Sequence, residues 1–288
     1  MIKTRDGKIV SGNNEGQGKV LKALYGNSAG RFVLKFLTAP PVSRTVGAFM
    51  DSPLSKPLIK PFIKSNNIDT SQYIMRGITT YNEFFTRKIK AGARCVDMKP
   101  EHLVSPCDSK LTVYPVSDKC LFPIKESLYS VSDLLGGSHK LADRYKGGLC
   151  LIFRLEVDDY HRYCYFDSGV KGCNVFVKGV LHTVNPIALE HYNIYKRNCR
   201  EFTLLKTENF GTCAQIEVGA MMVGKISNHH QRHSFRRGEE KGMFLFGGST
   251  IVLLLEKDKA VIDTDIMKNS AQGYETVVKY GEKIGVKF

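Results

Sequence analysis

After Val104, the apolar residues of this chain come in short runs separated by glycine, aspartate and asparagine. Runs this short, bounded by turn-forming residues, are typical of strands rather than helices. The clearest runs are residues 111–116, 149–155, 175–177 and 251–255. We therefore expect residues 101–288 to form a predominantly antiparallel β domain that carries the functional residues.

The N-terminal third has a different pattern. Between residues 17 and 50, apolar side chains recur every three or four positions among lysines and arginines, which predicts an amphipathic helix. Pro40 and Pro41 should break this helix. Residues 52–64 again combine apolar with basic side chains, and residues 71–91 fit a further short helix. The predicted fold class is α+β, with amphipathic helices in a basic region over residues 1–100, followed by the β domain.

The charge of the chain is strongly positive and unevenly spread. There are 42 Lys and Arg against 28 Asp and Glu, and residues 1–64 hold eleven of the basic residues but three acids. This excess favours an anionic partner. Because we find neither interleaved base-stacking aromatics nor a recognition helix, we expect an anionic membrane surface and no nucleic acid. The alternative is that the basic helices pack on the β domain.

Targeting signals are not evident. The first residues lack the apolar core of a signal peptide, and no stretch approaches the roughly 18 apolar residues of a spanning helix. We therefore expect a peripheral protein on the cytoplasmic face of a membrane. The eight cysteines form no C-x-x-C pair, so we expect reduced thiols, most of them buried.

Ser249 is the residue with the most suggestive position. It follows Gly247 and Gly248 and directly precedes the most apolar run of the chain. The hydrolase elbow G-x-S-x-G requires glycine two places after the serine, where this chain has Ile251. By itself the segment also fits an ordinary turn. Partners for a serine nucleophile exist elsewhere, namely His161 after a predicted buried strand and Asp108 in a turn before another.

Six ordered segments resemble the phosphatidylserine decarboxylase family, from about Tyr81 to the C-terminus. They are residues 82–87 (NEFFTR), 105–108 (SPCD), 159–162 (DYHR), 182–186 (HTVNP), 217–220 (EVGA) with Val223-Gly224, and 242–244 (GMF) leading into 246–250 (FGGST).

The resemblance implies a proenzyme that cuts itself between Gly248 and Ser249, giving a β chain of 1–248 and an α chain of 249–288. His161 would act as the base toward Ser249, and Asp108 would orient and charge His161. Ser249 would become a pyruvoyl group, which forms a Schiff base with the substrate and replaces an external cofactor. The implied reaction converts phosphatidylserine to phosphatidylethanolamine and CO2, and the family suggests a homodimer of cleaved protomers.

Some positions depart from the family pattern or have no assigned role. Ser109 stands where glycine often follows the aspartate, and Cys164 stands where a second histidine often follows. Asn185 lies in a matched segment, but the sequence assigns it no role. Residues 229–233 (HHQRH) have no carboxylate or cysteine at ligand spacing, and arginines surround them, so we expect a basic loop and no metal.

Other functions remain open from the sequence. A decarboxylase with the same pyruvoyl chemistry could act on a soluble amino acid, with the N-terminal helices packed inward. A serine hydrolase acting on external esters and a non-enzymatic lipid-binding β domain are further alternatives. An uncut chain with stable activity would favour the hydrolase over the self-cleaving proenzyme.

Overall fold

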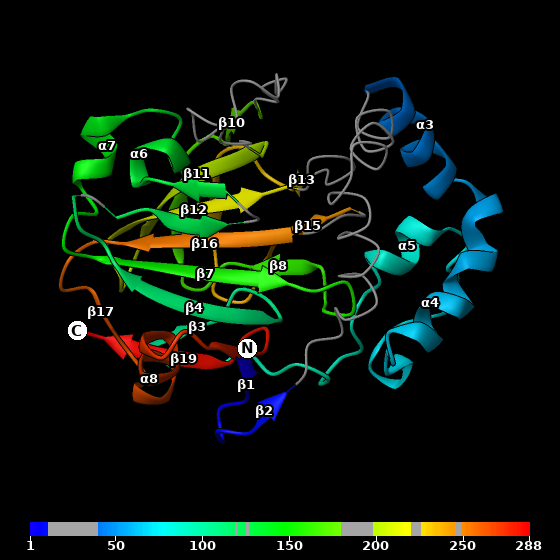
Figure 1. Ribbon diagram of the computed structural model, residues 1–288, viewed down its shortest axis with the longest axis horizontal. Helices are drawn as coiled ribbons and strands as arrows, with labels where there is room; N and C mark the ends of the chain where they lie inside the picture. Colours follow the sequence, from blue (N-terminus) through cyan, green and yellow to red (C-terminus); the bar gives the residue numbers. More distant parts are fainter. Residues whose placement is uncertain (11–39, 119, 125–126, 180–197, 220–225, 246–248) are drawn as a thin grey trace, which may run out of the picture.

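The structure is a computed structural model, and it describes residues 1–10, 40–118, 120–124, 127–179, 198–219, 226–245 and 249–288 (Figure 1). Side chains of residues 40–44 are not described. The described elements confirm the predicted α+β class with predominantly antiparallel strands.

A large sheet forms the centre of the molecule. Among the described residues it has eleven strands, and neighbouring strands are antiparallel except β1 and β18. In spatial order these are β14 (His233–Phe235), β9 (Gly169–Lys171), β11 (Arg200–Thr207), β12 (Thr212–Val218), β16 (Ser249–Leu255), β7 (Leu149–Leu155), β4 (Ser109–Pro115), β18 (Glu275–Val278), β1 (Ile2–Lys3) and β2 (Ile9–Val10), with β10 (Val175–Val177) beside β11.

Strand β16 shows why the most apolar run becomes a central strand. It lies between β12 and β7, so both of its edges are hydrogen-bonded. Alternate side chains of a strand point to opposite faces, and here Leu253 packs in one core cluster while Val252 and Leu254 pack in another. A strand buried on both faces needs a continuous apolar run rather than alternation.

Two smaller sheets and a hairpin complete the β structure. The two sheets pack on one face of the main sheet through a shared core cluster, and the hairpin covers the other face with helices α6 and α7. The sheets are β13 (Ile226–Asn228), β15 (Glu240–Phe244) and β8 (Arg162–Cys164), and β17 (Ala260–Ile262), β19 (Lys283–Lys287) and β3 (His102–Val104); the hairpin is β5 (Phe122–Ile124) and β6 (Ser127–Tyr129). The helices are α6 (Val131–Leu134), α7 (His139–Asp143) and α8 (Thr264–Ala271).

The N-terminal helices lie together at one side of the main sheet, on the right of Figure 1, near the end where β16 begins. They are α3 (Pro40–Met50), the 3-10 turns η1 (Pro53–Leu58) and η2 (Thr70–Gln72), α4 (Ile59–Ser65) and α5 (Tyr81–Phe85). A third core cluster joins Ile59, Phe84 and Phe85 of these helices to Tyr160. None of the helices in the described ranges has the length and apolar character needed to span a bilayer.

Three details differ from the sequence expectations. Residues 17–39 of the predicted first helix lie outside the described residues. Pro40 and Pro41 lie in the first described turn of α3 rather than breaking a helix, and first-turn N–H groups need no intrahelical partner. Residues 1–10, expected in a helical region, instead contribute β1 and β2 to the main sheet. None of the eight cysteines, all of which lie in the described residues, is part of a disulfide, and four of them rather than most are buried. The division at residue 100 stays a prediction.

Candidate active site

Ser249 is the first residue of β16 and is 1% exposed. Its backbone pairs with Leu155, the last residue of β7, so the sheet holds it from the side. The Ser249 Oγ atom lies 3.5 Å from His161 Nδ1. A contact of this length is long for a hydrogen bond but common between catalytic partners before the reacting group is engaged.

The second ring nitrogen of His161 determines what the first can do. The Nε2 atom lies 3.0 Å from the backbone carbonyl oxygen of Glu156. A carbonyl can only accept, so Nε2 must carry the proton of this hydrogen bond. In the neutral imidazole, Nδ1 is then an acceptor. The Nδ1 lone pair faces Ser249, which is the arrangement that a general base requires.

Packing also holds the His161 ring in place. The ring of Phe85 stacks on it at 3.9 Å between centroids and an interplanar angle of 28°. Phe85 ends α5, a short helix that begins with a capping box formed by Thr80 and Glu83. The Phe244 N–H of β15 donates to the His161 carbonyl at 2.9 Å. Contacts with helix α5, with strand β15 and with the Glu156 carbonyl therefore hold His161 in place.

Asp108 is buried near the start of β4, but it bonds other partners. Arg94 donates Nε to Oδ1 at 3.0 Å and Nη2 to Oδ2 at 2.6 Å, and the Tyr280 N–H donates at 2.8 Å. Burial favours a raised pKa, but Arg94 and Lys279 outweigh it and hold the Asp108 pKa below its usual value. Within the described residues, the hydrogen bonds of the Asp108 carboxylate thus go to Arg94 and Tyr280 rather than to His161.

Known proteins with similar sequences identify the family. A family model described as phosphatidylserine decarboxylase matches residues 81–286. The chain is 46% identical over 285 residues to phosphatidylserine decarboxylase proenzyme 2 of Clostridium acetobutylicum. The matched region covers 99% of this chain and 97% of that relative. The chain belongs to the phosphatidylserine decarboxylase family. Phosphatidylserine decarboxylase proenzymes of Clostridium tetani (40% over 275 residues, 94% and 92% covered) and Desulfitobacterium hafniense (37% over 275 residues, 93% and 92%) are also similar.

Membership of the phosphatidylserine decarboxylase family confirms the resemblance drawn from short motifs, and the matched region begins at Tyr81 as expected. Of the predicted site residues, the structure brings His161 and Ser249 together. Gly248 and Asn185 lie outside the described residues. Cys164, at the position where the family often has a second histidine, is buried, and burial raises its pKa to about 12. It is therefore a neutral thiol at physiological pH.

Sequence reasoning missed three groups around the site. Phe85 was part of a matched motif, which could have pointed to it, but the motif gave it no role. Arg94 carried no motif signal. The Glu156 carbonyl is a backbone group, so no residue type could have revealed it.

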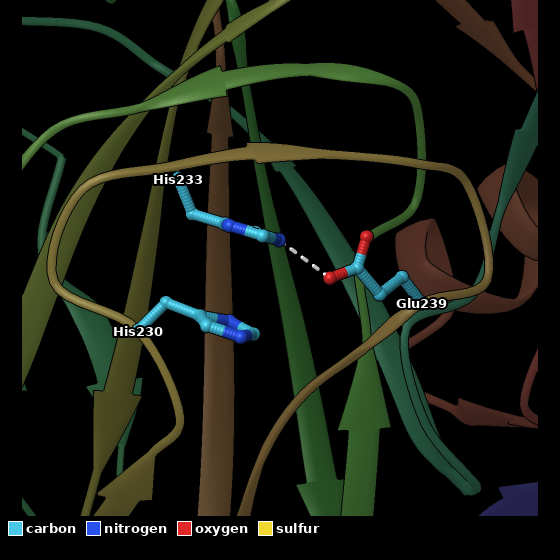
Figure 2. Close-up of side chains that lie close together, drawn as sticks. All are labelled: His230, His233 and Glu239. Atoms are coloured by element: carbon cyan, nitrogen blue, oxygen red, sulfur yellow. Dashed lines mark hydrogen bonds and ion pairs between the residues drawn. The ribbon is translucent and has the colours of Figure 1, made fainter.

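The histidines of residues 229–233 are organised differently from the expected basic loop. The prediction that no carboxylate lies at ligand spacing is wrong in space, because Glu239 folds back on this segment. His233 Nε2 lies 2.6 Å from Glu239 Oε1, and His230 stacks on His233 (Figure 2). His229 instead pairs with Glu240, at 2.6 Å. Glu239 lies six positions after His233 in the chain, and the turn between them brings the two side chains together.

Proposed function

We propose that this chain is the proenzyme of a phosphatidylserine decarboxylase that cuts itself between Gly248 and Ser249 and converts phosphatidylserine to phosphatidylethanolamine and CO2. The observation that carries the proposal is the contact of Ser249 Oγ with His161 Nδ1, in a chain of this family. The hydrogen bond from His161 Nε2 to the Glu156 carbonyl supports the role of His161 as base.

The first step forms an ester within the chain. His161 Nδ1 takes the Oγ proton as Ser249 Oγ attacks the carbonyl carbon of Gly248. The Gly248–Ser249 C–N bond breaks, and the nitrogen receives the proton to become an amine. Glycine before the serine offers no Cβ to obstruct this attack.

The second step cuts the chain. Loss of the Ser249 Cα proton and cleavage of its Cβ–Oγ bond release residues 1–248 as a carboxylate and leave dehydroalanine at position 249. Water then replaces the nitrogen, releasing ammonia and leaving a pyruvoyl group at the start of residues 249–288. The buried position at the start of a fixed strand fits such a group, because residue 249 is held in the sheet and faces His161.

A pyruvoyl group supplies an electron-withdrawing carbonyl that accepts the electrons released when CO2 leaves. No further cofactor enters the proposal. His161, stacked on Phe85 and bonded to Glu156, stays next to position 249. We propose that Nδ1, unprotonated at the outset, accepts a proton from the substrate's ammonium group and then delivers that proton to the decarboxylated product. Asp108 enters the proposal as a buried negative charge that is hydrogen-bonded to Arg94 rather than to His161.

Replacing the serine tests the cleavage directly. Ser249→Ala removes the nucleophile, so the variant should remain a single uncut chain. The wild type should give fragments 1–248 and 249–288 on denaturing electrophoresis, and mass spectrometry should find a blocked, carbonyl-bearing end on the smaller one. Ser65→Ala, an exposed serine on α4, should be cut normally. Efficient cutting of Ser249→Ala would refute the scheme, whereas an uncut, active wild type would favour a hydrolase.

The membrane is the proposed location of the lipid substrate. Phe49, Leu54 and Leu58 expose apolar side chains beside the exposed Lys56 and Lys60, a combination that binds anionic bilayers. We propose peripheral docking of residues 1–100 on a cytoplasmic membrane face, with the cleaved protomers paired in a homodimer. Analytical ultracentrifugation of the cleaved protein tests the dimer.

Vesicle co-sedimentation tests the docking surface. The protein should pellet with vesicles that contain phosphatidylserine but not with phosphatidylcholine alone. Leu54→Ser together with Leu58→Ser should reduce pelleting several-fold, whereas Val261→Ser, an exposed apolar residue outside residues 1–100, should not. Equal decarboxylation of free serine and of the lipid, with no pelleting, would instead favour an enzyme for a soluble amino acid.

A further inference from the structure

His230, His233 and Glu239 form a cluster outside the proposed active site. One potential ligand atom from each residue lies within 4.8 Å of the other two. The imidazole rings of His230 and His233 stack at 3.9 Å between centroids and 12° between planes, and Figure 2 shows the Glu239 carboxylate directed at His233. Two imidazoles and a carboxylate thus face a common volume.

The backbone holds these three residues before any ligand binds. His233 lies in β14 and pairs with Lys171 of β9. The Tyr165 N–H donates to the Glu239 carbonyl at 2.9 Å, and the Arg236 N–H donates to the second Glu239 carboxylate oxygen at 3.0 Å. The His230 carbonyl accepts from Lys171 Nζ at 2.6 Å. Such outer contacts orient metal ligands in known sites.

One atom of the cluster lacks a partner that a folded protein normally supplies. His230 Nδ1 is buried, and no hydrogen-bond partner for it lies within the described residues. Burying an unpaired ring nitrogen costs free energy. A bound cation would satisfy this nitrogen.

We infer that His230, His233 and Glu239 bind a late first-row divalent cation, with Zn²⁺ as the physiological ion. Two imidazoles and one carboxylate are a common zinc donor set that leaves a fourth position for water, whereas Mg²⁺ and Ca²⁺ prefer oxygen ligands. Ligand atoms about 2 Å from zinc lie roughly 3.4 Å apart in a tetrahedron. The 2.6 Å contact between His233 and Glu239 must open slightly, and the wider pairs must close, by side-chain rotation.

The surrounding cations oppose binding less than the sequence indicates. Lys171 Nζ is directed at the His230 carbonyl and at Asn174 Oδ1, and Arg232 Nε is directed at Cys173 Sγ, 3.2 Å away. Glu239 contributes one compensating negative charge. The bound ion would join β14 to the turn that leads into β15, and so brace the strand whose Phe244 contacts His161.

Metal titration of the full chain tests the site. After treatment with a chelator, Zn²⁺ should bind with a stoichiometry of one and raise Tm, whereas Mg²⁺ at the same concentration should do neither. His230→Gln, His233→Gln and Glu239→Gln should each weaken Zn²⁺ binding at least about tenfold. The matched controls are His229→Gln, in the same segment but paired with Glu240, and Cys173→Ser. Each should change the affinity less than about threefold, since neither residue is a ligand.

Co²⁺ serves as the spectroscopic probe for the same variants. Visible bands of a tetrahedral site without a thiolate charge-transfer band in the near ultraviolet are the expected result. A thiolate band, or equal loss of affinity in His229→Gln or Cys173→Ser, would overturn the proposal, as would unchanged binding by Glu239→Gln. Near-ultraviolet circular dichroism of each metal-free variant establishes that it is folded, so a loss of binding reports on the ligand.

Discussion

A backbone carbonyl determines the chemistry of His161. Because the Glu156 carbonyl can only accept, it holds the proton of the ring on Nε2, so that Nδ1 is the acceptor that faces Ser249. In the familiar triad a carboxylate has this orienting task. Here the carboxylate expected for it, Asp108, is bound by Arg94. Within the described residues, the Glu156 carbonyl rather than the Asp108 carboxylate thus orients the His161 ring.

Asp108 should stabilise the protein in a pH-dependent way. Its pKa is lowered in the folded chain, so its contribution is complete above the unfolded pKa of about 3.9 and disappears as the pH falls through the lower folded value. Asp108→Asn leaves Arg94 without its charged partner, which should lower the free energy of unfolding by about 3 kcal/mol at pH 7. The difference from the parent chain should shrink below about pH 4.

Urea unfolding followed by circular dichroism checks this, with Ser249→Ala as the parent so that one uncut chain unfolds. Asp118→Asn is the control, because its ion pair with Lys146 is exposed and such pairs contribute little. A pH-independent difference between Asp108→Asn and its parent would contradict the assignment. If Ser249 is kept and Asp108→Asn cuts itself as fast as the wild type, Asp108 has no part in the cleavage scheme.

At the scale of elements, α5 carries two core residues, of which one also contacts the site. Phe85 stacks on His161, whereas its neighbour Phe84 contacts Phe62 and Tyr81. Both side chains are 0% exposed, so each is a fair control for the other.

Phe85→Leu should slow self-cleavage roughly ten- to hundredfold, because it frees the His161 ring from its stacked position. Phe84→Leu should lower Tm by a similar amount without that delay. The rate is measured by denaturing electrophoresis of newly synthesised chains, and Tm is measured on uncut Ser249→Ala versions of both variants. Equal delays would mean that Phe85 acts through folding alone.

Elements were predictable from the sequence where burial imposed a pattern. The run at 149–155 is β7, and the run at 251–255 lies within β16, because a strand covered on both faces must be apolar throughout. The pairing of His161 with Ser249 was reached through family motifs. The contacts of Arg94 and of Glu239 could not be predicted in this way. They depend on how turns fold back on the rest of the chain, which the type of a side chain does not indicate.

At the scale of the whole molecule, the segment 249–288 is woven into the rest. It contributes β16 between β12 and β7, and β18 between β4 and β1. From the other fragment, the Arg5 guanidinium bonds Asp263, Asp265 and Glu282. The hydrogen bonds that Arg5 donates to Asp265 contribute most to its raised pKa. These contacts do not depend on the Gly248–Ser249 peptide bond.

The two proposed fragments should therefore stay in one particle after cleavage. Native size-exclusion chromatography should elute both together, and denaturing electrophoresis of the same fraction should separate them. Arg5→Ala should lower the urea concentration at which the fragments part, whereas Lys8→Ala, whose ion pair with Asp6 is exposed, should not. Recovery of free 249–288 in native buffer would contradict the packing.

The position of Ser249 at the first residue of the central strand also sets the order of events. A sheet with β16 in its middle must be assembled before the cut, while the strand is still tethered to the chain that supplies its neighbours. Cutting turns a unimolecular folding reaction into a bimolecular one. After the proposed cut, an unfolded protein can refold only when its two fragments associate, so the lifetime of the active protein is governed by the rate of unfolding rather than by the free energy of unfolding.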